Sequence, residues 1–185
     1  TGDVSQTGGI AGAMEDEETA ASITDCHFSG SVTGNLQVGG IVGCVGLHNK
    51  VEKCSNTARV TGKQQVGGIA GANSYGNLYY CFNTGAVGGE DAKYVGGIVG
   101  ENQNYAELVG CYNRGAVTGA DYVGGVAGYN DAQGIIKNGQ NTRFGVTGII
   151  VGEGDCVGGL VGLNCAARLP AVQIKANRIE GTHFV

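Results

Sequence analysis

A short glycine-rich phrase recurs six times along the 185 residues of this chain. Its clearest copy is VGGIVG, which runs from Val95 to Gly100. The period of the repeat is 28 to 34 residues, as the first glycines of the six pairs show: Gly8, Gly39, Gly67, Gly96, Gly124 and Gly158. A phrase that returns at such a period is typical of a repeat architecture, in which each unit buries its apolar face against its neighbours.

A second phrase lies between the glycine pairs. It is clearest as LYYCFNTGAVGG from Leu78 and LVGCYNRGAVTG from Leu108, while the copy from Ile136 has Gly139 in place of cysteine and the last one, near Val172, is eroded. Both phrases are short aliphatic or aromatic runs bounded by glycine or asparagine, without a 3.6-residue period, which indicates strands and turns. We therefore predict one all-β domain over residues 1–185: a right-handed parallel β-solenoid of about six coils, with two or three short strands in each coil.

Composition supports a packed fold. The chain has 37 glycines and one proline, which does not fit collagen, and its 42% hydrophobic and 15% charged residues do not fit disorder. So much glycine predicts repeated positive φ angles or repeated close approach of backbones. The net charge of −5 without a basic block argues against nucleic-acid binding, and the apolar runs are too short for this segment to insert into a membrane.

The glycine phrase could also be a phosphate-binding loop. Such a loop needs a helix behind it to supply its dipole, or a Gly-Lys-Ser/Thr sequence, and the chain has neither pattern. The glycines are therefore interpreted as structural. No cofactor is expected.

Cysteine occupies one repeat position in four units, and we expect an inward column of reduced thiols: Cys26, Cys54, Cys81 and Cys111. Stacked cysteines have parallel Cβ vectors, which do not suit disulfide geometry. Cys44, Cys156 and Cys165 lie outside the column and their pairing is left open. No metal site is predicted, because no Cys-x-x-Cys pair occurs and the histidines share no motif with the cysteines.

Asparagine also returns in register and predicts two structural ladders of stacked amides. The first consists of Asn56, Asn83, Asn113 and Asn141, and the second of Asn73, Asn102, Asn130 and Asn164.

Two tyrosines stand out from the framework. Tyr94 and Tyr122 precede glycine pairs in adjacent repeats, where other units have glutamine or cysteine. A ring with a polar tip suits contact with a protein or a glycan, and we take these two residues as the candidate binding site. The structural alternative is that tyrosine simply covers the surface of a strand. The acidic run from Glu15 to Glu18 is interpreted as a solvated link rather than a calcium loop.

The alternation of VGGIVGEN with CYNRGAVTG resembles the GLUG-motif repeat, whose core is most literal in GLVG, from Gly159 to Gly162. The resemblance extends from Gly8 to about Gly181. It implies a module of a secreted or surface-attached bacterial protein, such as an adhesin or an immunoglobulin-A-cleaving metallopeptidase. The His-Glu-x-x-His sequence of those peptidases is absent here, so catalysis is not implied.

We therefore expect a non-catalytic stalk or adhesive spacer, located outside the cell or on its surface, that contacts a host protein or glycan. Two alternatives are a substrate-recognition region of a larger secreted protease and a polysaccharide-degrading β-helix enzyme. The chain reads as a piece of a longer surface protein, and open strand edges at its ends predict end-to-end self-association.

Overall fold

The computed structural model describes residues 5–15, 18–137, 140–141, 149–165, 173–175, 178–179 and 183–184. The described residues form short β-strands joined by turns, with no helix, and so none that could span a membrane. The strands make five sheets of six strands each, and every strand pair in them is parallel. The prediction of an all-β parallel solenoid is therefore confirmed.

We name the sheets A to E in the order in which one coil visits them. Sheet A contains β1 (Ser5–Gly8), β6 (Leu36–Gly39), β11 (Gln64–Gly67), β16 (Lys93–Gly96), β21 (Asp121–Gly124) and β26 (Val157–Gly158). Sheet B contains β2 (Ala11–Met14), β7 (Val42–Val45), β12 (Ala70–Ser74), β17 (Val99–Gln103), β22 (Ala127–Asn130) and β27 (Val161–Asn164).

The second phrase of the repeat forms the other three sheets. Sheet C contains β3 (Ser22–Thr24), β8 (Lys50–Glu52), β13 (Asn77–Tyr79), β18 (Glu107–Val109), β23 (Ile135–Lys137) and β28 (Gln173–Lys175). Sheet D contains β4 (His27–Phe28), β9 (Ser55–Asn56), β14 (Phe82–Asn83), β19 (Tyr112–Asn113), β24 (Gln140–Asn141) and β29 (Arg178–Ile179). Sheet E contains β5 (Ser31–Thr33), β10 (Arg59–Thr61), β15 (Val87–Gly88), β20 (Val117–Gly119), β25 (Ile149–Gly152) and β30 (His183–Phe184).

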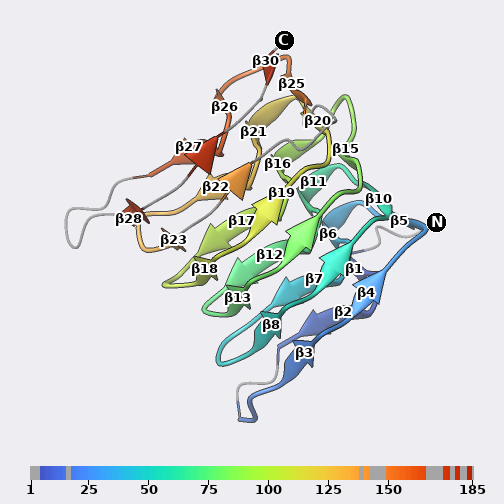
Figure 1. Ribbon diagram of the computed structural model, residues 1–185, viewed down its shortest axis with the longest axis vertical. Helices are drawn as coiled ribbons and strands as arrows, with labels where there is room; N and C mark the ends of the chain where they lie inside the picture. The colour runs from blue at the N-terminus through green and yellow to red at the C-terminus, as the bar shows by residue number, and fades with distance from the viewer. Residues whose placement is uncertain are drawn as a thin grey trace.

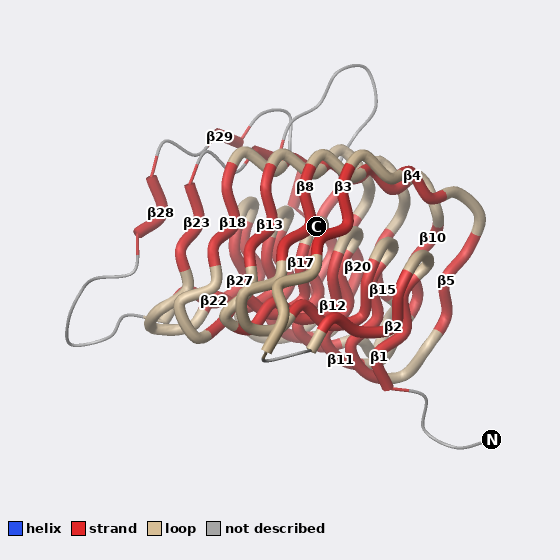
Figure 2. Tube along the Cα trace, turned by 90° about the horizontal axis from the view of Figure 1, so that it is seen from below, coloured by secondary structure: helices blue, strands red, loops and turns tan. Residues whose placement is uncertain are grey.

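Each strand pairs with the strand five places further along the chain, so every coil adds one strand to each sheet. Between β1 and β26 the chain makes about five turns, close to the six coils expected. The colour order of the stack in Figure 1, and the row of equivalent strands in Figure 2, follow this succession. The expectation of two or three strands in each coil was wrong, because the turns divide each coil into five short strands.

The interior holds two separate apolar clusters. Valines such as Val38, Val66 and Val95 of sheet A pack against Val60 and other residues of sheet E. The second cluster lies among sheets B, C and D and includes the aliphatic residue that follows the glycine pair in five coils: Ile41, Ile69, Ile98, Val126 and Leu160. Every layer of both clusters repeats the one before it, since paired strands are in register.

The coil is pinched between these clusters, where the second glycine of each pair meets sheet D. A Cβ atom on Gly68 would lie 2.2 Å from the carbonyl oxygen of Gly97 and 2.4 Å from the Cγ atom of Asn83. Gly40 has the same relation to Asn56, and Gly97 to Asn113. In the first coil, Phe28 replaces the asparagine and lies against Gly9. Only glycine leaves room for the opposite side chain and the next backbone layer.

Of the two expected reasons for the glycine pairs, close approach is therefore the one that applies, and none of the paired glycines has a positive φ among the described residues. Two residues before each pair, a non-glycine residue takes a positive φ of 51° to 61°: Gln6, Gln37, Gln65, Tyr94, Tyr122 and Cys156. The third glycine of the phrase allows this bend. A Cβ on Gly71 would lie 2.3 Å from the carbonyl carbon of Gln37, and one on Gly128 2.5 Å from that of Tyr94.

Buried asparagines connect the coils through their side chains. Asn56 Nδ2 donates to Asn83 Oδ1 at 2.8 Å, and Asn83 Nδ2 donates to Asn113 Oδ1 at 2.9 Å. Backbone register pairs Asn141 with Asn113, although the side chain of Asn141 lies outside the described residues. The same amides bond the turn that follows in their own coil, as Asn83 does with Gly85.

The second asparagine ladder begins with an unpaired acceptor. Asn73 donates to Asn102, Asn102 to Asn130, and Asn130 to Asn164, with distances of 2.8 to 2.9 Å. Asn73 pairs on its other side with Val45, whose side chain cannot donate, and Asn73 Oδ1 is buried without a hydrogen bond. The three hydrogen bonds of this ladder therefore point the same way, from the Nδ2 atom of one coil to the Oδ1 atom of the coil that follows.

We expect Gly97→Ala to destabilise the fold by about 3 kcal/mol, because its Cβ would lie 2.2 Å from the Gly125 carbonyl oxygen and 2.3 Å from Asn113 Cγ. Gly89→Ala is the matched control, since its nearest neighbour would be 3.7 Å away. Chemical denaturation of both variants measures the difference. Equal stability of the two variants would contradict the role assigned to the glycine pair.

We also expect Asn102→Ala to cost about 1–3 kcal/mol more than Asn73→Ala, although both side chains are fully buried. The first change leaves both Asn73 Nδ2 and Asn130 Oδ1 without their ladder partner, while the second removes one ladder bond and an acceptor that is already unpaired. Denaturation curves of the two variants give this comparison. A larger loss for Asn73→Ala would argue against the directional ladder.

Candidate functional site

The two tyrosines singled out in the sequence stack on each other in the structure. The rings of Tyr94 and Tyr122 have centroids 4.7 Å apart and planes inclined by 3°. Each is half-buried on sheet A, on neighbouring strands β16 and β21. Their positive φ angles, 55° and 57°, lie in the left-handed region that costs a tyrosine about 1 kcal/mol.

Residues of sheet B complete this surface. The side chain that follows the third glycine of each phrase lies beside the bent residue of sheet A. Tyr129 meets Tyr94 edge-on, with ring centroids 5.9 Å apart and an interplanar angle of 85°. Gln65 Nε2 donates to Glu101 Oε2 across the same boundary. We call the five residues the tyrosine patch: Gln65, Tyr94, Glu101, Tyr122 and Tyr129.

Glu101 and Tyr129 were not identified from the sequence. Both occupy the position after the third glycine, where the other copies have Ala13, Cys44, Ala72 and Leu163. Strand register places Ala72, Glu101 and Tyr129 in one column of sheet B. An alignment of the six phrases would have marked this position as the variable one, but its closeness to Tyr94 depends on the bend.

Burial and neighbouring side chains shift the pKa values of the titratable groups in the patch. Burial raises the pKa of Glu101, and the charge of Asp131 adds to this, while the hydrogen bond from Gln65 acts in the opposite direction. The pKa of Tyr94 is raised by burial and by neighbouring Tyr122 and Glu101. The Cys165 thiol donates to the Tyr129 hydroxyl at 3.3 Å, and this contact, with burial, raises the pKa of Tyr129.

An ion pair borders the patch on sheet A. Lys93 Nζ lies 2.7 Å from Asp121 Oδ2, on the same two strands as the stacked tyrosines. The bond to Lys93 lowers the pKa of Asp121, and a backbone N–H donated by Asp155 lowers it further. The patch therefore has one neutralised charge pair at its edge and one crowded carboxylate, Glu101, near its centre.

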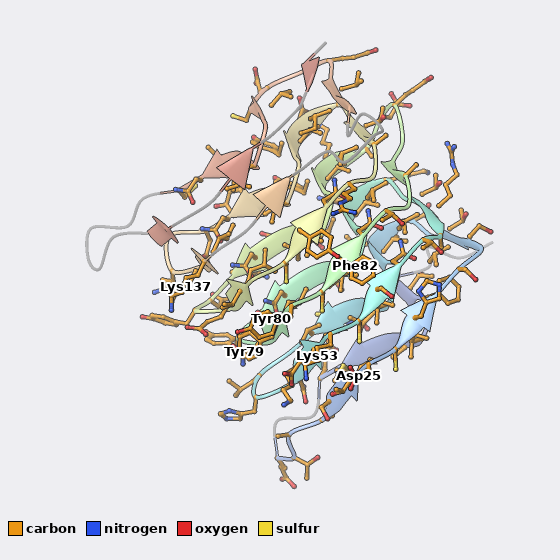
Figure 3. All side chains as sticks on the ribbon, in the orientation of Figure 1. Asp25, Lys53, Tyr79, Tyr80, Phe82 and Lys137 are labelled. Carbon is orange, nitrogen blue, oxygen red and sulfur yellow. The ribbon has the colours of Figure 1, made fainter. Side chains whose placement is uncertain are left out.

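Other aromatic side chains lie elsewhere on the solenoid. Tyr79 and Tyr80 project from sheet C and the turn after it, and Phe82 from sheet D (Figure 3). Phe82 stacks on Tyr112 at 5.2 Å, and the guanidinium of Arg114 lies 5.3 Å from the Tyr112 ring centroid. Tyr75 and Tyr105 are exposed in the turns between sheets B and C. The structure thus separates the tyrosines that crowd the middle of the sequence from Tyr94 and Tyr122.

The cysteines lie where the repeat puts them. Cys54, Cys81 and Cys111 are buried and Cys26 packs beside them, each thiol donating to a backbone carbonyl. All seven cysteines are free, including Cys44, Cys156 and Cys165. Burial and neighbouring Glu15 raise the pKa of Cys44 to about 12, so its thiol stays protonated at neutral pH. Among the described residues, no group of three or more His, Cys, Asp or Glu side chains could hold a metal ion.

We expect Glu101→Gln to stabilise the protein at neutral pH. The folded-state pKa of Glu101 lies above the ordinary value of 4.5, so the wild type loses stability as the pH rises through the interval between these two values. Glutamine can still accept the hydrogen bond from Gln65. Thermal denaturation should show a higher midpoint for the variant at about pH 7 and little difference below the ordinary value. A variant that is less stable at both pH values would contradict this.

Residues 91–118 match a family model, the GLUG motif. The match begins just before β16 and ends within β20, so it corresponds to one coil. No curated protein and no solved structure matches the chain. The phrases that align with the matched coil recur in register through the other coils. The chain therefore contains a GLUG motif within a repeat region that is folded as a β-solenoid.

Proposed function

We propose that this repeat region is a non-catalytic binding module of a secreted or surface-attached bacterial protein, and that the tyrosine patch contacts a partner protein. The observation that carries the proposal is the stacked pair Tyr94 and Tyr122, bordered by Tyr129 and Glu101. The rest of the solenoid would act as a rigid stalk that presents this surface.

The pattern of variation along the repeat supports a binding role. Inward positions keep valine, glycine and asparagine from coil to coil, as the register of Val66, Val95 and Val123 shows. The two outward columns of the patch change from glutamine to tyrosine, and from alanine to glutamate and tyrosine. Packing requires none of these changes, because Gln37 and Gln65 adopt the same bend as Tyr94. Variation at surface positions of a rigid scaffold is typical of recognition.

The geometry of the rings favours a protein over a glycan. One face of Tyr94 and one face of Tyr122 cover each other, and Tyr129 packs against Tyr94, so few open ring faces remain beside the ring edges and hydroxyl groups. Sugars bind aromatic residues mainly through open ring faces, whereas proteins also contact edges and hydroxyls. A half-buried carboxylate among tyrosines also suits a donor group of a protein partner.

Preorganisation would help such a contact. The backbone of the patch belongs to sheets A and B, whose strands pair in register on both sides. Asn102 and Asn130 of sheet B are joined by the second asparagine ladder. A partner would therefore not have to order a loop, which lowers the entropic cost of binding.

The two earlier alternatives use the same residues differently. In a substrate-recognition region of a larger secreted protease, the patch would bind the protease substrate, which is again a protein. A polysaccharide-degrading enzyme would need two available carboxylates, and the candidates at the patch are Glu101 and Asp131, whose charges interact. Asp131, however, accepts backbone N–H groups from Asn104, Gln133 and Gly134, so its oxygens are used in a turn. This favours the non-catalytic proposal.

The test is binding of the purified chain to an array of host proteins and glycans. The double variant Tyr94→Gln, Tyr122→Gln is suitable because glutamine occupies this bent position in three other coils. We expect it to bind a protein partner at least about tenfold more weakly than the wild type. Tyr75→Gln is the matched control, since Tyr75 is exposed and also has a positive φ of 60°.

The outcomes separate the hypotheses. Equal loss in the control variant would mean that the tyrosine patch is not the site. If the wild type bound only glycans and the double variant lost that binding, the tyrosine patch would remain the site. Its partner would then be a glycan rather than a protein. Absence of binding to every protein and glycan would leave only the role of a structural spacer.

A further inference from the structure

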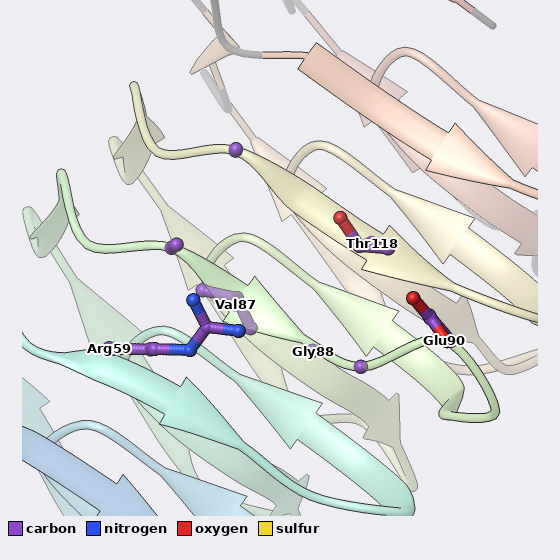
Figure 4. A pocket seen from close by; sticks show the side chains of 8 residues that line it. Arg59, Val87, Gly88, Glu90 and Thr118 are labelled. Carbon is purple, nitrogen blue, oxygen red and sulfur yellow. The ribbon is translucent and has the colours of Figure 1, made fainter.

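A hollow of about 310 Å³ lies on the outer face of sheet E, on a different sheet from the tyrosine patch (Figure 4). The residues that shape it are Arg59, Ala86, Gly88, Glu90, Ala116 and Thr118. They come from three successive coils, through β10, β15 and β20.

Small residues make the hollow. Arg59, Ala86 and Ala116 each precede a valine of the register series Val60, Val87 and Val117, so they form one outward column of sheet E. The two alanines leave a shallow floor beyond the arginine. This column changes abruptly from a long cationic side chain to methyl groups, and the change opens space on the surface.

Gly88 keeps the floor bare. Its φ is +103°, and a Cβ atom there would lie 1.9 Å from the carbonyl oxygen of Thr118. No other residue fits without displacing β20. Just beyond it, the link to the next coil carries Glu90, and this link is two residues longer than the equivalent link in three other coils. The extra residues place a carboxylate at the rim.

The charges at the rim have no partner. Arg59 and Glu90 are exposed and lie on opposite sides of Gly88 (Figure 4), and within the described part of the chain no hydrogen bond or ion pair involves either head group. Elsewhere the chain pairs such charges across adjacent coils, as Lys93 and Asp121 do at 2.7 Å. A cation and an anion are thus held apart across an uncharged floor.

From this arrangement we propose that the hollow binds a short stretch of polypeptide that carries one acidic and one basic side chain. The acidic group would pair with the Arg59 guanidinium, which can donate two parallel hydrogen bonds to a carboxylate. The basic group would pair with Glu90. The aliphatic stems of the two side chains would lie over Ala86 and Ala116, as long charged side chains commonly do on apolar surface.

Size and polarity favour a peptide over other zwitterions. The volume of about 310 Å³ is at the lower end for small-molecule pockets, and the exposed rim leaves a ligand partly in solvent. A segment of a longer chain fits such a site better than a free small molecule. Thr118 is the one hydroxyl among the lining side chains, which is few for a sugar with several hydroxyl groups.

The experiment is a titration of the whole 185-residue chain with capped synthetic peptides, followed through the backbone amide resonances of Gly88, Gly89 and Glu90. The peptides carry one glutamate and one lysine, separated by zero to three alanines. Their matched analogues replace the glutamate, the lysine or both by glutamine. We expect saturable shifts at these amides for at least one spacing, and about tenfold weaker binding when either charge is removed.

Variants of the protein test which groups are responsible. Arg59→Gln should weaken binding about tenfold, while Arg114→Gln, which removes the same charge from the side chain over Tyr112, should leave it unchanged. The double variant Arg59→Glu, Glu90→Arg exchanges the two rim charges. It should bind the peptide in which glutamate and lysine have changed places. Higher salt should weaken binding, because the rim is exposed.

Several results would overturn the proposal. They are shifts of equal size with the uncharged peptide, full affinity in Arg59→Gln, or no shift at these amides with any spacing. None of these results depends on Tyr94 or Tyr122, so this site can fail while the tyrosine patch stands, and the reverse also holds.

Discussion

The contact between the second glycine of a pair and the opposite side chain of sheet D, an asparagine in the middle coils, is the constraint on which this solenoid depends. It brings the turn between sheets A and B so close to sheet D that a single methyl group, on Gly68 for example, would overlap both Asn83 and the next backbone layer. The pinch divides the interior into two apolar clusters. It also buries the amides, which must then pair with one another and with their own turns, because an unpaired buried amide is costly.

The third glycine has a second consequence, which reaches the surface. Without a side chain at Gly100 or Gly128, the backbone of sheet A in the preceding coil can lie against sheet B. The residue in contact takes a positive φ, whether it is Gln65 or Tyr94. Its side chain then stands beside the residue that follows the third glycine. Structural glycines thus create the outer boundary where Tyr94, Tyr122, Tyr129 and Glu101 gather.

The two proposed binding surfaces coincide with departures from the repeat, on a framework that is otherwise constant from coil to coil. At the tyrosine patch, large side chains replace glutamine and alanine in the middle coils. On sheet E, small residues at Ala86, Gly88 and Ala116 leave a hollow beside an unpaired Arg59. Because each coil packs only on its neighbours, such substitutions change the surface locally without altering the stack.

The repeat in the sequence was enough to predict the parallel β-solenoid, its period and its columns of cysteine and asparagine, because residues one period apart must meet in a stack. It also selected Tyr94 and Tyr122 as neighbours. Three features became visible only in the folded chain: five strands make a coil, glutamine and tyrosine rather than the paired glycines take positive φ, and Glu101 reaches Gln65. These features depend on contacts between neighbouring coils, such as that between Gly100 and Gln65, and the pattern within one phrase does not specify the geometry of such contacts.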